Sequence, residues 1–105
     1  MFDVIISEEL KNKAVKHFTE EYEWKYKDVL EVIEVLKQNS YCILGGDILN
    51  SKLEYTYDNW YFKEYDNMSY AQSVLESANQ TIDYIDRYYK RNGNSYYYIL
   101  VAATK

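Results

Sequence analysis

The glycine pair Gly45-Gly46, followed at once by Asp47, is the most specific local motif in the chain. It comes after a β-rich run at residues 41–44, where glycine allows a positive φ angle or a close approach of two backbones. The motif is not a phosphate cradle, because neither the GxxxxGK[ST] nor the GxGxxG spacing is present. Two interpretations stay open: a turn that presents Asp47 at a site, or a β-bulge in a bent hairpin.

A second motif, Asp58-Asn59-Trp60-Tyr61, interrupts the next extended segment. An Asx pair at such a place commonly forms a turn or a bulge. Trp and Tyr are among the residues that dominate binding hot spots. We therefore predict a partner-binding site that consists of Asp47, Asp58, Asn59, Trp60 and Tyr61. The alternative is that Trp60 fills the core and that Asp58 only satisfies backbone amides.

Catalytic and metal chemistry have weaker support. Asp47 and Asp58 lie on consecutive extended segments, and paired carboxylates can act as general acid and base. Any acidic hairpin contains such a pair, so this spacing is not specific. His17 has no second histidine with which to bind a metal, and Cys42, the only cysteine, is expected to be a buried and unreactive thiol. We expect no catalytic residue, no metal and no cofactor.

Composition limits the class of protein. The 105 residues predict one domain, residues 1–105, and the single cysteine excludes an internal disulfide and suits a reducing cytoplasm. Residues 1–9 lack the basic and long apolar parts of a signal peptide, and no apolar run reaches the roughly 20 residues of a membrane span. The net charge of −5 disfavours binding to nucleic acid or an anionic membrane and favours a basic protein partner.

Two compositional features each allow two interpretations. Acidic residues are dense from Glu20 to Glu34, where they form either a solvated helix face or a surface that attracts a basic partner. The fourteen tyrosines either reflect an A/T-rich coding genome or supply contact area for binding.

Hydrophobic spacing predicts the elements that must position these motifs. Apolar residues at i+4 steps predict a helix over residues 8–20 with Ser7 as N-cap, preceded by a short strand or packed arm at residues 2–6. Residues 20–27 are expected to be a connector. A wide apolar stripe then predicts a helix that is capped by Asp28 and ends near Asn39, in a left-handed conformation at that residue.

The second half is expected to contain a hairpin, a helix and a final strand. Residues 41–49 and 53–62 predict two extended segments joined by a turn at residues 50–52. Ser69 and Gly93 bracket the clearest helical pattern in the chain, and residues 96–102 predict a central last strand.

The element order (β)ααββαβ indicates an α+β fold, with a small antiparallel or mixed sheet and helices packed on one face. The predicted core consists of the apolar residues that recur at helical or strand spacing. These are Leu30, Ile33, Leu36, Ile43, Val74, Ala78, Ile82, Ile85, Ile99 and Val101.

Several short segments together resemble a family of bacterial polymorphic-toxin immunity proteins, the fortieth in the numbered series of such families. The resemblance spans roughly residues 24–101. Its segments are Trp24-Lys25-Tyr26, the apolar helix after it, Ile43-Leu44-Gly45-Gly46-Asp47-Ile48, Tyr57-Asp58-Asn59-Trp60-Tyr61, the late aromatic helix and Tyr97-Tyr98-Ile99-Leu100-Val101.

The resemblance implies a cytoplasmic protein, encoded beside a toxin, that binds and neutralises this cognate toxin and is not an enzyme. A basic nuclease-type toxin would suit the negative charge. Two alternatives stay open: a small-molecule or peptide-binding regulatory module with a pocket near Gly46, Asp58 and Trp60, and a hydrolase that uses Asp47 and Asp58. The oligomeric state is left open.

Overall fold

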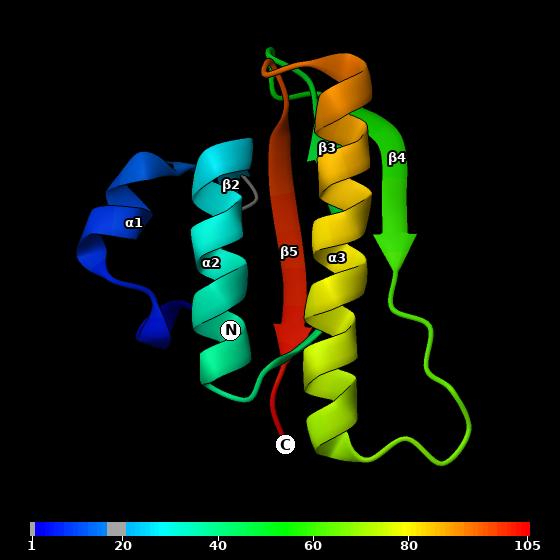
Figure 1. Ribbon diagram of the computed structural model, residues 1–105. Helices are drawn as coiled ribbons and strands as arrows, with labels where there is room; N and C mark the ends of the chain where they lie inside the picture. Colours follow the sequence, from blue (N-terminus) through cyan, green and yellow to red (C-terminus); the bar gives the residue numbers. More distant parts are fainter. Residues whose placement is uncertain (1, 17–20) are drawn as a thin grey trace.

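Helices and strands alternate along the chain in the computed structural model, which describes residues 2–16 and 21–105 (Figure 1). The elements are the 3-10 helix η1 (Phe2–Ile5), α1 (Glu8–Lys13), β1 (Val15–Lys16), β2 (Tyr22–Lys25), α2 (Tyr26–Gln38), β3 (Cys42–Leu49), β4 (Tyr55–Tyr61), α3 (Tyr70–Asn92) and β5 (Tyr97–Ala103).

The strands form one sheet in the order β1-β2-β5-β3-β4, in which every neighbouring pair is antiparallel. The helices α2 and α3 lie side by side across one face of this sheet, and α1 lies beyond α2 (Figure 1). This arrangement confirms the predicted α+β class with helices on one face. β5 is central, as its continuous apolar run predicts.

The predicted helix ends are mostly confirmed by their caps. The Ser7 side chain accepts from the amide of Leu10, and Ser69 forms a full capping box with Gln72 at the start of α3. Gly93 ends α3 with a φ of 87°. The start of α2 was predicted wrongly, because Lys25, and not Asp28, is its N-cap residue.

The structure also differs from the prediction in two details, one after α2 and one at the N-terminus. After α2, Ser40 takes the positive φ of 61°, whereas Asn39 has a φ of −102°. Residues 2–5 form a 3-10 helix that buries Phe2, so the packed arm is confirmed and the strand is not.

The predicted helix over residues 8–20 is too long. α1 ends at Lys13, and Val15 and Lys16 pair with β2, so the helical pattern stops where strand pairing begins; residues 17–20 lie outside the described part. The predicted connector contains the strand β2. Trp24 pairs with Tyr98 of β5, is fully buried and donates from its indole N–H to the Leu10 carbonyl at 3.0 Å.

The core lies between the sheet and the helices, and most of its predicted members are buried. Those confirmed are Ile33, Leu36, Ile43, Val74, Ala78 and Ile85. Ile99 is buried as predicted, but on the opposite face of the sheet, where it pairs with Asp47. Leu30 and Ile82 are half-buried and pack against this core. Val101 was predicted wrongly: its side chain is 43% exposed, because it lies on the sheet face opposite the helices.

The indole of Trp60 connects β4 to α3. Its N–H donates to the Thr81 hydroxyl at 3.1 Å, and its ring stacks on Tyr84 with 5.2 Å between centroids. The indole lies against Gly46 of β3, where an added Cβ would stand 2.3 Å from the ring and 2.2 Å from the Ile99 carbonyl oxygen. Glycine is therefore required at position 46 for this packing.

Tyrosine rings fill the space between the helices and the end of the sheet. Tyr26 and Tyr89 stack with 3.8 Å between centroids, and Tyr88 meets the ring of Tyr98 edge-on. The Tyr26 hydroxyl donates to Asp86, and this bond, with burial, raises the pKa of Tyr26 to about 12. Burial and then a hydrogen bond to an aspartate also raise the pKa of Tyr88 to about 12.

The first prediction concerns Trp60. Because its ring is buried between β3 and α3, Trp60→Ala should lower the free energy of unfolding by about 3–5 kcal/mol, measured by urea denaturation. The neighbouring Tyr61→Ala is the control, since that side chain is 75% exposed and should change stability by less than about 1 kcal/mol. Equal losses in the two variants would contradict the core role of Trp60.

The second prediction concerns alkaline pH. The folded chain holds the protons of Tyr26 and Tyr88 more tightly than the unfolded chain does, so their contribution to stability is fully present below about pH 10. It should be lost as pH rises from about 10 to about 12, measured as a falling urea midpoint. Tyr26→Phe/Tyr88→Phe should flatten that fall, whereas Tyr57→Phe should leave it unchanged, since Tyr57 is exposed. A single tyrosinate absorbance step near pH 10 would contradict the prediction.

Candidate partner-binding site

Strand β4 is the outer strand of the sheet in the described part of the chain, and its pairing with β3 is irregular. Asp47 lies opposite Asn59 and Leu49 lies opposite Tyr55, so four steps along β4 match two along β3. Within the resulting bulge, Tyr57 has a φ of 68° and is 89% exposed. The predicted interruption at Asp58-Asn59 is therefore a bulge.

A threonine holds this bulge in place. The Thr56 hydroxyl donates to the Ile48 carbonyl at 2.8 Å and accepts from the amide of Asp58 at 3.2 Å. The side chain thus replaces hydrogen bonds that the ladder loses there.

The glycine pair also belongs to a bulge, on the opposite side of β3. Ile43 pairs with Ala102 and Gly45 with Val101, so β3 gains one residue relative to β5. Gly45 has a φ of 152°, and an added Cβ there would stand 2.2 Å from the Trp60 carbonyl oxygen. Of the two interpretations of Gly45-Gly46, the structure supports the bulge.

Side-chain alternation divides the predicted site between the two faces of the sheet. Trp60 points toward α3 and is buried, with 7% of its surface exposed, so it is a core residue. Asn59 and Tyr61, its neighbours in the strand, therefore point to the face without helices, which we call the open face.

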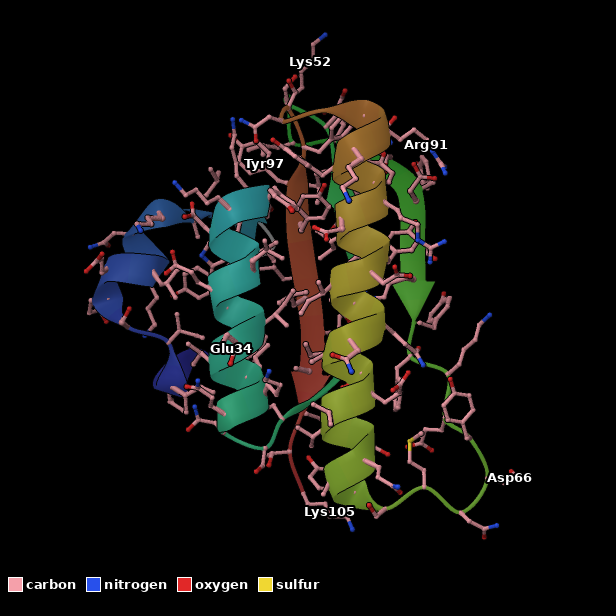
Figure 2. All side chains as sticks on the ribbon, viewed as in Figure 1. Glu34, Lys52, Asp66, Arg91, Tyr97 and Lys105 are labelled. Atoms are coloured by element: carbon pink, nitrogen blue, oxygen red, sulfur yellow. The ribbon has the colours of Figure 1, made fainter. Side chains whose placement is uncertain are left out.

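The two aspartates are also separated. Asp58 accepts from the Tyr88 hydroxyl at 2.9 Å and lines a hollow on the helix side of β4, beside Arg87 and Arg91. Figure 2 shows Arg91 at the C-terminal end of α3. Asp47 lies in a different hollow, on the open face. The structure does not bring the two carboxylates together, so they do not form an acid–base pair.

The hollow that holds Asp47 has a volume of about 240 Å³. Four of the five predicted site residues line it, and Asp58 does not. Its lining is Leu44, Gly45, Gly46, Asp47, Asn59, Trp60, Tyr61 and Val101. We call it the open-face hollow.

Sequence reasoning missed two members of this lining. Leu44 is 46% exposed and Val101 is 43% exposed, so both are surface apolar residues, although their strand neighbours Ile43 and Leu100 are buried. Strict alternation along β5 could have identified Val101 as a residue that points away from the helices, because its neighbour Leu100 packs in the core.

The open face carries negative charge next to this hollow. Burial, followed by the charges of Glu21, Asp47 and Glu23, raises the pKa of the Tyr55 hydroxyl. No lysine or arginine of the described residues lines the open-face hollow. An approaching partner therefore meets a largely apolar depression in which the charged side chain is Asp47.

The helix side of β4 has a different character. A hollow of about 380 Å³ runs between β4 and α3, where Lys63, Gln80 and Arg87 contribute to its lining. Arg87 forms an ion pair with Asp83, one turn earlier in α3. Strand β4 thus lies between a polar hollow on the helix side and the open-face hollow.

The acidic stretch of residues 20–34 does not form one surface. Glu23 is buried, whereas Glu31 and Glu34 are exposed on α2, where Glu34 pairs with Lys37 at 3.0 Å. Glu20 lies outside the described residues, as does His17. Cys42 is buried, as predicted, with its thiol 3.9 Å from the Ser73 carbonyl oxygen.

Residues 2–16 and 21–105 contain no group of three or more His, Cys, Asp or Glu side chains that could hold a metal ion. None of their helices is both long enough and apolar enough to cross a membrane.

Comparison with known proteins points to one family. Searches of the curated proteins and of the solved structures each found no match. A protein-family model described as Immunity protein 40 matches residues 9–102. This range includes most of α1, all of α2 and α3, both bulges and the whole open-face hollow. The chain therefore belongs to the Immunity protein 40 family.

Proposed function

We propose that this chain is a cytoplasmic immunity protein that binds a cognate bacterial toxin and neutralises it by direct protein contact. The observation that carries the proposal is the family match over residues 9–102. The family is named for immunity, and immunity against a toxin requires recognition of that toxin. The distribution of side chains at the edge of the sheet gives this recognition a physical basis.

Binding fits the site better than catalysis does. Asp47 and Asp58 line separate hollows, so the hydrolase alternative lacks its pair of carboxylates. The open-face hollow, at about 240 Å³, is also smaller than the roughly 300–1,000 Å³ of pockets that hold drug-sized ligands. Those dimensions favour a protein partner that places one side chain there over a small-molecule ligand.

The proposed contact surface is β4 with its open-face neighbours. Asp47, Asn59 and Tyr61 face outward around the hollow, and Tyr57 projects from the bulge. Tyrosine is well suited to such a surface, because it buries a large area with little loss of conformational freedom. Trp60 holds this surface in place from the core side and does not itself contact the partner.

The bulge also affects how a partner would approach β4. An exposed strand edge can accept a further strand, but a bulge with a positive φ angle at Tyr57 interrupts the regular row of backbone groups. We therefore propose that recognition relies on side chains more than on strand addition. The net charge of −5 suits a basic toxin, such as a nuclease-type domain.

The third prediction tests the function and its surface together. The proposed function expects the toxin to be the product of a gene beside the one for this chain, and that product is used in the test. Expressed with that toxin, the wild-type chain should restore growth and form a stable complex. Tyr57→Ala/Tyr61→Ala should weaken the complex by at least about 2 kcal/mol in a calorimetric titration, because both rings are exposed at the proposed centre.

The control for this test is Tyr65→Ala. That ring is 63% exposed but lies in the loop between β4 and α3, outside the proposed contact. It should bind the toxin as the wild type does. Failure of the wild-type chain to protect cells would contradict the function, whereas equal binding by the double variant would contradict only the surface.

The fourth prediction concerns the rate of association. Complementary charge steers two proteins together, and this attraction is screened as the Debye length falls from about 10 Å at 0.1 M salt to about 3 Å at 1 M. The association rate measured by stopped-flow fluorescence should therefore fall steeply with salt, while the dissociation rate changes little. An association rate that stays constant over that range would exclude electrostatic steering.

A further inference from the structure

We infer that the open-face hollow receives a single arginine side chain of the toxin, with its guanidinium group at Asp47. This inference rests on the proposed function and specifies the chemistry of the partner at that site. It follows from three properties of the hollow: an aspartate without a partner, apolar walls and a small volume.

The Asp47 carboxylate has no hydrogen-bond or ion-pair partner among the described residues. By contrast, Asp58 accepts from Tyr88 and Asp86 accepts from Tyr26. Asp47 is half-buried in the hollow, directly across the β3–β4 ladder from Asn59, which places a carboxylate and an amide side by side. A half-buried carboxylate is stabilised most by a charged donor, because charge-assisted hydrogen bonds are the stronger ones.

The remaining walls of the hollow suit the stem of a long cationic side chain. Leu44 and Val101 present exposed apolar surface, and Tyr61 presents an aromatic ring. An arginine buries its methylene stem against such surface while its charged head keeps polar contacts. Its guanidinium can also stack on a tyrosine ring, which attracts cations to its face.

Charge and shape together favour arginine over other side chains. Among the described residues, Asp47 is the one charged side chain in the lining of the hollow, and the chain carries a net charge of −5, so a cation is favoured there over an anion. A planar guanidinium can donate two parallel hydrogen bonds to a carboxylate and a further one to the Asn59 carbonyl oxygen. The ammonium of lysine is a point charge and lacks this forked geometry.

The test compares Asp47→Asn with Asp66→Asn in binding to the same purified toxin. Both changes remove one negative charge from an aspartate, but Asp66 lies in the loop between β4 and α3 (Figure 2) and does not line the hollow. Asp47→Asn should weaken binding by about 30-fold or more, the loss expected when one partner of a buried charge pair is removed. Asp66→Asn should change it by less than about 3-fold.

A footprint then identifies the partner residue. An arginine-specific dicarbonyl reagent, applied to the toxin alone and to its complex with the wild-type chain, should reveal an arginine that the complex protects. Replacing that arginine with Gln should remove most of the effect of Asp47→Asn, so that the double change is less than about 3-fold weaker than the toxin change alone. Additive losses, or no protected arginine, would overturn the inference.

The outcomes separate this inference from the proposed function. A toxin that the wild-type chain does not bind would overturn the function itself. Tight wild-type binding, together with an Asp47→Asn variant that binds equally well, would overturn only the arginine at the hollow. Unfolding of Asp47→Asn by urea should match that of the wild type, because the carboxylate has no partner to lose among the described residues.

Discussion

The packing of the Trp60 indole between Gly46 and α3 is the interaction on which the candidate site depends. It joins three elements, because the ring lies on β3, belongs to β4 and is hydrogen-bonded to Thr81 of α3. With Trp60 committed to the helix side, Asn59 and Tyr61 must face the other way. The absence of side chains at Gly45 and Gly46 lets β3 and β4 approach closely and leaves backbone in the lining of the open-face hollow.

The tyrosines fall into two groups. Packed tyrosines occupy the carboxylates of two aspartates with hydrogen bonds, whereas exposed tyrosines leave neighbouring carboxylates open to a partner. Rings such as Tyr26 and Tyr88 pack against the core, and their hydroxyls bind Asp86 and Asp58. Those carboxylates already have partners. Asp47 has none among the described residues and lines the open-face hollow, which is where we propose that a cation of the partner binds. Tyr61, by contrast, is free to contact a partner.

The sequence predicted well where a pattern is local. The caps at Ser7 and Ser69, the periodicity of α3 and the hairpin of β3 and β4 all follow from neighbouring residues. It failed for β1 and β2, because two- and four-residue strands exist only through their partners. The pairing of Trp24 with Tyr98, more than seventy positions away, has no local signal.

The sequence by itself determined the fold class, the family, most of the core and the two chain interruptions at Gly45-Gly46 and Asp58-Asn59. Only the tertiary structure decided which face each candidate residue occupies. The physical reason is that side chains alternate along a strand, so a bulge that adds one residue reverses the face of those that follow. The one-residue bulge at Gly45 in β3 therefore turns Asp47 to the open face. In β4, Asn59 faces the same way as its partner Asp47, and alternation places Asp58 and the buried Trp60 on the helix side.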